Sequence, residues 1–65
     1  MHYYIIVVVK TTKTYSFGIK SDKQLTSKED AINVCLKQNR LEDAKDAEFI
    51  YDYLEITEYE YSTMR

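Results

Sequence analysis

The sequence predicts a small α+β domain in which a three-stranded antiparallel sheet, with strand order 2-1-3, carries one helix on one of its faces. Three segments are rich in aromatic and β-branched residues, at residues 3–10, 14–20 and about 48–56, and one amphipathic segment separates the second from the third. Such residues lose rotamer freedom in a helix and pack well on a pleated surface. A chain of 65 residues is expected to form one domain, residues 1–65, with the element order ββαβ and a short final helix.

The first predicted strand is apolar on both of its faces. Residues 3–10 read Tyr-Tyr-Ile-Ile-Val-Val-Val-Lys. Alternation places Tyr3, Ile5, Val7 and Val9 on one face and Tyr4, Ile6 and Val8 on the other. A strand that is apolar on both faces is usually central and covered on both sides. We therefore expect this strand to lie in the middle of the sheet.

The second predicted strand alternates cleanly. Tyr15, Phe17 and Ile19 share one face between polar neighbours, which is typical of a half-buried strand. The connection at 11–13 contains no Asn-Gly or Asp-Gly pair, so we expect a loop longer than two residues. Gly18 inside the strand indicates either a bulge or a close approach of another group to the backbone.

The amphipathic segment predicts a helix over about 27–39. The sequence Thr26-Ser27-Lys28-Glu29 fits a capping box, and Asp30 adds negative charge to the first turn. Apolar residues then recur at helical spacing, at Ala31, Ile32, Cys35 and Leu36.

Residues 41–57 fit two interpretations. As a helix, the segment presents a stripe of Leu41, Ala44, Ala47, Tyr51 and Leu54. As a strand, it presents Phe49, Tyr51 and Tyr53 on one face and Ile50, Leu54 and Ile56 on the other. The composition changes at about Glu48 from Ala, Glu, Asp and Lys to aromatic and β-branched residues. We therefore predict a loop or short helical turn at 41–46 and a strand at about 48–56.

A second capping-box pattern, Thr57-Glu58-Tyr59-Glu60, predicts a short helix from Glu58 to Met64. A helix of this length does not persist alone in water, so it must dock on the rest of the chain. The alternative is that the third strand continues and frays.

One helix can cover only one face of this sheet. A right-handed crossover through the helix returns the third strand to the free side of the first. The other face then keeps an apolar surface beside the aliphatic residues of the first strand, made of either Phe49, Tyr51 and Tyr53 or Ile50, Leu54 and Ile56. Large exposed apolar patches usually mark interaction sites. We expect a non-enzymatic interaction protein that forms a homodimer, or binds another protein, through a tyrosine-rich face or an edge strand. The predicted surface consists of Phe49, Tyr51, Tyr53 and Tyr59.

The charge distribution suggests an alternative partner. Residues 1–28 carry five lysines and one acid, whereas residues 29–65 carry four bases and ten acids. Lysines that alternate with aromatic residues resemble, in chemistry, surfaces that bind nucleic acid. The alternative function is therefore a nucleic-acid-associated regulator using Lys10, Lys13 and Lys20. The acidic second half opposes it, and the order of elements is not that of an RNA-recognition motif.

The sequence predicts no catalytic, cofactor-binding or metal site. His2 and Cys35 are the only residues of their kinds, and we interpret them as a terminal histidine and a buried structural cysteine. A single glycine, Gly18, cannot build a phosphate-binding loop. The lone cysteine favours the cytoplasm. No membrane association is expected, because the apolar run from Tyr3 to Val9 is too short to cross a bilayer.

Overall fold

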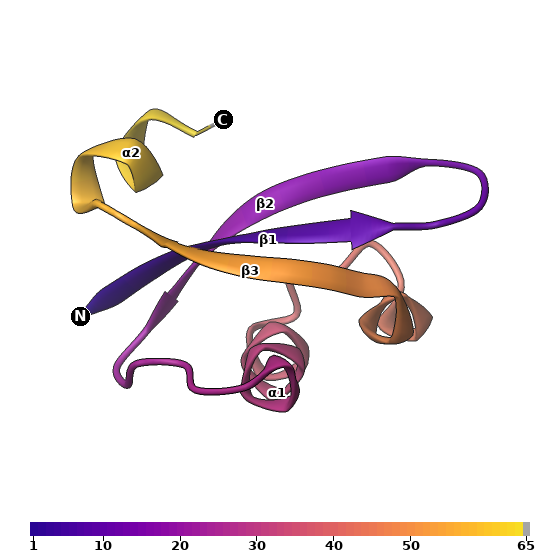
Figure 1. The fold of residues 1–65 in the computed structure, drawn as a ribbon, viewed down its shortest axis with the longest axis horizontal. Coiled ribbons are helices and arrows are strands. Elements are labelled where there is room, and N and C mark those ends of the chain that lie inside the picture. The colour runs from indigo at the N-terminus through magenta and orange to yellow at the C-terminus, as the bar shows by residue number, and fades with distance from the viewer. Residues whose placement is uncertain (65) are drawn as a thin grey trace.

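The computed structural model describes residues 1–64. Strands β1 (His2–Val9) and β2 (Thr14–Ser21) are followed by helix α1 (Lys28–Gln38) and a 3₁₀ helix, η1 (Ala44–Phe49). Strand β3 (Ile50–Ile56) and helix α2 (Glu58–Thr63) complete the chain. The strands form one antiparallel sheet in the order β2-β1-β3 (Figure 1), which confirms the predicted fold class and the central position of β1.

The core lies between the sheet and α1. Tyr4, Ile6 and Val8 of β1 are buried there, with Ile19 of β2 and the small residues Ala31 and Cys35 of α1. Complete burial of one isoleucine or valine side chain contributes about 1.5–3 kcal/mol to stability. The hydroxyl of buried Tyr4 accepts a hydrogen bond of 2.8 Å from the backbone N–H of Leu25. This bond satisfies the buried phenol and ties the loop before α1 to the sheet.

Helix α1 begins one residue later than the predicted capping box implied. Ser27, not Thr26, is the N-cap, and its hydroxyl accepts from the backbone N–H of Asp30 at 3.2 Å. With Ser27 as the N-cap, the Asp30 carboxylate accepts hydrogen bonds from both the N–H and the hydroxyl of Thr26, at 3.2 and 2.8 Å. Glu29 takes no part in these bonds. The helix ends at Asn39, which adopts the left-handed conformation (φ 53°) that asparagine tolerates.

Strand β3 contains a β-bulge that the alternation pattern did not reveal. Val8 of β1 pairs with Ile50, whereas its neighbour Val7 pairs with Asp52, so Tyr51 is the extra residue. The bulge allows both Ile50 and Tyr53 to face α1, although their positions differ by three and strict alternation would place them on opposite faces. The prediction that Tyr53 shares a face with Tyr51 and Phe49 is therefore wrong. Glu48 and Phe49 also belong to η1, not to the strand.

Helix α2 packs on the face of the sheet opposite α1, at the end near the N-terminus (Figure 1). The predicted capping box between Thr57 and Glu60 is present, and the helix docks as expected. The Tyr61 ring lies 5.0 Å from the Tyr3 ring, centroid to centroid. The same ring occupies the space beside Gly18, where an added Cβ would lie 2.9 Å from Tyr61 Cδ1. Gly18 thus marks a close approach, and the β1–β2 register contains no bulge there.

Replacing Gly18 with alanine is expected to displace Tyr61 and loosen α2. The backbone at Gly18 suits any residue, so the effect is steric, and crowding of this kind costs about 1–2 kcal/mol. Urea unfolding followed by circular dichroism measures the loss. Thr14→Ala, on the same strand and face but near the hairpin, is the matched control. Equal stability of Gly18→Ala and the control would contradict the inferred packing.

Candidate interaction surface

The sheet face opposite α1 is only partly covered. Helix α2 shields its Tyr3 end, and aliphatic side chains remain accessible toward the hairpin. Leu54 is 54% exposed and Val9 is 42% exposed, while Ile5 and Val7 between them are half-buried. We call this surface the open face, consisting of Ile5, Val7, Val9 and Leu54. The register places these residues side by side, since Ile5 pairs directly with Leu54.

The open face carries little charge. On the β2 side, Val7 pairs with Ser16 and Val9 with Thr14, so the flanking positions are small and neutral. On the β3 side, Val7 pairs with Asp52, whose carboxylate accepts a 2.8 Å bond from the backbone N–H of Tyr53. A mainly aliphatic surface with one carboxylate beside it suits a partner of the same character.

The aromatic residues predicted to form the interaction surface do not come together. Phe49 lies in η1, and Tyr51 projects at the bulge with 67% of its surface exposed. Tyr53 turns inward, where its ring meets the buried Tyr4 ring edge-on at 6.2 Å. Tyr59 lies on α2 and is 77% exposed. Contact of any of these residues with a partner stays a prediction, but they do not form one face.

The sequence left two alternatives for the uncovered face, and Leu54 belongs to the second of them, beside the aliphatic residues of β1. The sequence did indicate that β1 is apolar on both faces. The register of β3 against β1, which decides that Leu54 and not Tyr53 joins this face, depends on the bulge at Tyr51. No short-range pattern in the sequence marks that bulge.

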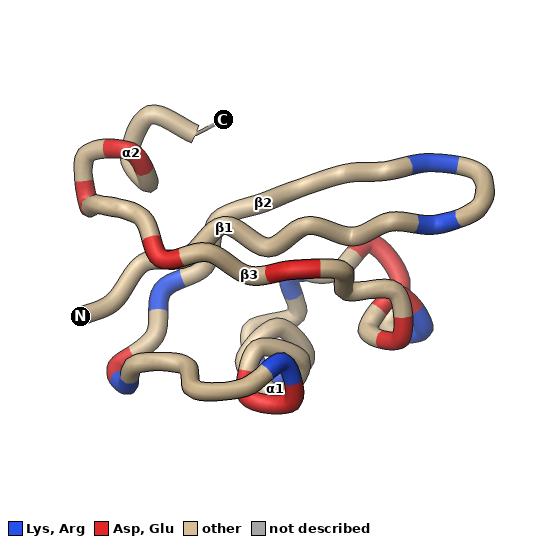
Figure 2. Tube along the Cα trace, viewed as in Figure 1, with Lys and Arg blue, Asp and Glu red and all other residues tan. Residues whose placement is uncertain are grey.

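The three lysines of the alternative prediction have separate partners within the chain. Lys10 Nζ lies 2.9 Å from Asp46 Oδ1, and Lys13 Nζ lies 2.5 Å from Glu42 Oε2. Lys20 Nζ lies 5.8 Å from the centroid of the Tyr61 ring. Lys10 and Lys13 lie in the turn between β1 and β2, while Lys20 lies near the other end of β2. Figure 2 shows basic segments on both arms of this hairpin. The three lysines do not converge on one surface, which weakens the nucleic-acid alternative.

A buried carboxylate connects η1 to the hairpin. Asp46 is 1% exposed, and its two oxygens meet Lys10 and the hydroxyl of Tyr15, which donates at 2.5 Å to Oδ2. The Tyr15 bond and the Lys10 bond hold the pKa of Asp46 below its ordinary value. Burial, reinforced by the Asp46 carboxylate, raises the pKa of Tyr15 to about 12. Sequence reasoning did not single out Asp46, because an acid in a polar segment carries no sign of burial.

His2 and Cys35 have no role in common. His2 Nδ1 lies 3.0 Å from Glu55 Oε2, across the ladder between β1 and β3. Cys35 is fully buried in the α1 face of the core, and burial raises the pKa of its thiol to about 11. A thiol of this kind stays protonated at neutral pH and packs as a small apolar residue.

The described part of the chain contains no group of three or more His, Cys, Asp or Glu side chains that could hold a metal ion. None of the helices within residues 1–64 is long and apolar enough to cross a membrane. Comparisons of the chain with protein-family models, with curated proteins and with solved structures find no match.

The environment of Tyr15 predicts a late step in a tyrosine titration. The folded chain should contain a phenol that ionises near pH 12 rather than at its ordinary value of 10.0, and this component should be absent from Tyr15→Phe. Near-ultraviolet absorbance of tyrosinate follows the titration. Loss of the bond to Asp46 should also lower the free energy of unfolding by about 1 kcal/mol. Superimposable titration curves for the two proteins would show that Tyr15 is not shielded.

The Asp46 carboxylate predicts acid sensitivity. Its folded-state pKa lies below the ordinary value of 3.8, so its contribution to stability is complete above that value and is lost as pH falls through the folded-state pKa. Urea midpoints should therefore fall below about pH 4. Asp46→Asn should be less stable at pH 7 and should lose less stability on acidification. The comparison variant is Asp30→Asn. It removes a different carboxylate, at the start of α1, whose pKa is also lowered, and its stability is measured over the same pH range. An unchanged acid response in Asp46→Asn would rule out this role.

Proposed function

We propose that this chain is a non-enzymatic protein-interaction module that associates with a second copy of itself through the open face. The observation that carries the proposal is the aliphatic surface of Ile5, Val7, Val9 and Leu54, which lies opposite α1 and is left uncovered beyond α2. A chain of this length buries only about 60% of its unfolded surface. Covering this face would add burial that one short helix cannot supply.

The size of the open face limits the strength of the association. Two strands about 4.8 Å apart and five residues at about 3.3 Å each define a patch of roughly 10 by 17 Å. Stable specific interfaces bury about 800 Å² on each partner, which is considerably more. The aliphatic patch therefore forms the centre of the interface, and α2 and the hairpin must supply its rim. Association is expected to be reversible in the micromolar range.

The position of α2 determines the arrangement of the two copies. Helix α2 projects from the open face at the Tyr3 end of β1, and the hairpin lies at the other end (Figure 1). A two-fold axis parallel to the strands would bring the two α2 helices into collision. A two-fold axis between the sheets and perpendicular to the strands avoids this collision. Because helix and sheet layers both pack about 10 Å from a sheet, each α2 then abuts the hairpin end of the partner.

The chemistry of the open face favours a second copy over a charged partner. Its flanking residues Ser16 and Thr14 are neutral, and the Asp52 carboxylate already accepts a backbone hydrogen bond. A closed two-fold dimer is also the commonest oligomer of soluble proteins. We include a cytoplasmic location in this proposal, because Cys35 is the only cysteine of the chain and is a buried free thiol.

Introducing a charge into the open face should dissociate the dimer. Leu54→Glu changes a side chain that is 54% exposed in the single chain, so the fold should tolerate it, whereas an unpaired carboxylate between two sheets would not be tolerated. Light scattering coupled to size-exclusion chromatography, over a series of concentrations, should show a dimer for the original chain. The variant should remain monomeric at concentrations at least tenfold higher.

Tyr51→Glu is the matched control, since Tyr51 lies on the same strand with 67% exposure but outside the open face. It should leave assembly unchanged. Dissociation by Tyr51→Glu and not by Leu54→Glu would move the interface to the tyrosine residues predicted from the sequence. A monomeric original chain at millimolar concentration would end the proposal.

A further inference from the structure

The outer edge of β2 carries unpaired backbone groups. Next to the β1–β2 ladder, the N–H of Lys10 donates to the C=O of Lys13 at 2.8 Å. In antiparallel pairing, alternate residue pairs exchange such bonds, so Tyr15, Phe17 and Ile19 direct their peptide groups toward β1. The peptide groups of the residues between them point away from β1. We call these outward groups the β2 edge; they belong to Thr14, Ser16 and Gly18.

The β2 edge is closed at one end and open in the middle. Beyond Gly18, the outward C=O of Lys20 accepts a 2.6 Å hydrogen bond from Gln38 Nε2, which confirms the direction of these groups. Within residues 1–64, the peptide groups of Ser16 and Gly18 have no hydrogen-bond partner from another element. An edge of this kind is a template for an additional strand.

The opposite edge of the sheet is blocked. On β3, the outward N–H of Tyr53 is taken by the carboxylate of Asp52 at 2.8 Å. The bulge at Tyr51 also disrupts the line of the strand. Bulges and inward-turned carboxylates are common devices that prevent edge pairing. The two edges of this sheet therefore differ, and only β2 offers a regular row of free groups.

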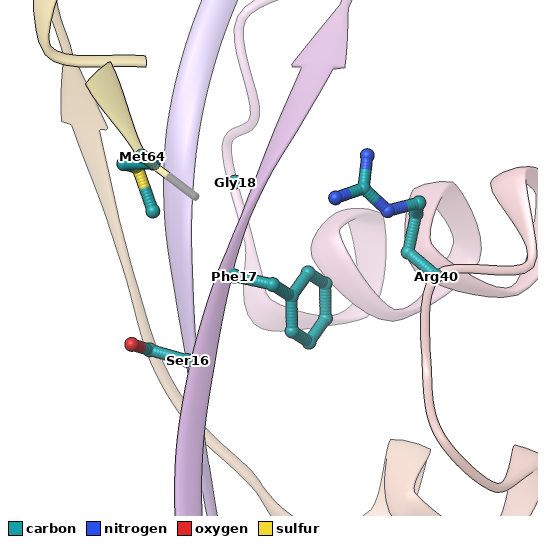
Figure 3. A pocket seen from close by; sticks show the side chains of 5 residues that line it. All are labelled: Ser16, Phe17, Gly18, Arg40 and Met64. Atoms are coloured by element: carbon teal, nitrogen blue, oxygen red, sulfur yellow. The ribbon is translucent and has the colours of Figure 1, made fainter. Parts of the chain in front are cut away.

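A cleft lies along the β2 edge, and one of the side chains that line it is positively charged Arg40. The cleft has a volume of about 310 Å³ and is lined by Ser16, Phe17, Gly18, Arg40 and Met64. Figure 3 shows Arg40 and Phe17 on one side of the strand and Ser16 and Met64 on the other. The Arg40 guanidinium lies 6.0 Å from the centroid of the Phe17 ring. No carboxylate of the described residues pairs with it within 4.0 Å.

Charge argues against pairing of β2 with a second β2. Lys13 precedes the strand and Lys20 lies within it, while β2 itself contains no acid. Although Lys13 is paired with Glu42, antiparallel pairing of two β2 edges would bring the Lys20 and Arg40 side chains of both copies to one seam. Like charges on neighbouring strands are destabilising. An occupant with a carboxylate is favoured instead.

We propose that the β2 edge binds an extended acidic peptide of a partner protein, which adds as a fourth strand, with a carboxylate on Arg40. Side chains of an added strand alternate between the two faces of the sheet. A residue on the Phe17 side meets the guanidinium, and its neighbours meet Met64 and Tyr61 on the other side. The recognised pattern is therefore one acidic residue between two apolar residues. This inference is independent of self-association, because the open face is a different surface.

The test uses a heptapeptide, Thr-Thr-Val-Glu-Val-Thr-Thr, acetylated and amidated at its ends, added to the ¹⁵N-labelled chain. The backbone amide resonances of Ser16 and Gly18 should shift and saturate. The same peptide with glutamine in place of glutamate should bind about tenfold more weakly, because it loses a charge-assisted hydrogen bond. N-methylation of the Val-Glu-Val residues should abolish binding, since it removes the strand hydrogen bonds.

Arg40→Gln should weaken binding of the glutamate peptide about tenfold and should abolish the difference between the glutamate and glutamine peptides. Lys37→Gln, at the exposed end of α1 but outside this cleft, should preserve the difference. Three results would overturn the inference: no shift at millimolar peptide, shifts at Val7 and Leu54 in place of Ser16 and Gly18, or equal binding of the two peptides to the original chain.

Discussion

The structure depends on one constraint, which is that β1 is apolar on both of its faces. The hydrogen-bonding groups on its two sides are satisfied by β2 and β3, so the strand must be central. Tyr4, Ile6 and Val8, on the face toward α1, are buried. Its odd-numbered residues are covered only where α2 reaches them, around Tyr3. Helix α2 (Glu58–Thr63) has only six residues and reaches only that end of the sheet, so the rest of this face is the open face.

The Asp46 cluster explains how β3 reaches its place beside β1. Asp46 holds η1 against the hairpin through Lys10 and Tyr15, at the point where the chain turns into β3. Strand β3 then begins with Ile50 in the core and must present Tyr53 to the core as well. The bulge at Tyr51 reconciles these two requirements. It also directs Leu54 toward the open face, so a polar contact at one end of the sheet helps to determine the surface on the other side.

The two edges and two faces of the sheet differ in whether they are covered or accessible. The α1 face is closed, the β3 edge is blocked by Asp52 and the bulge, and the open face and the β2 edge remain accessible. The accessible surfaces have distinct chemistry. The open face is aliphatic and nearly neutral, whereas the β2 edge carries free peptide groups beside the Arg40 guanidinium. The open face suits an identical copy of the chain, and the β2 edge suits an added strand that carries an acidic residue.

The sequence by itself determined the element order, the strand order and the approximate bounds of most elements. These follow from local propensity and periodicity: the run at 3–10, the alternation at 14–20, and the capping signals before α1 and α2. Tertiary structure alone decided the bulge at Tyr51, the burial of Asp46 and the membership of the open face. Each of these depends on which residue lies opposite in the fold, and a residue's own neighbours in the sequence carry no information about a partner 31 or more positions away.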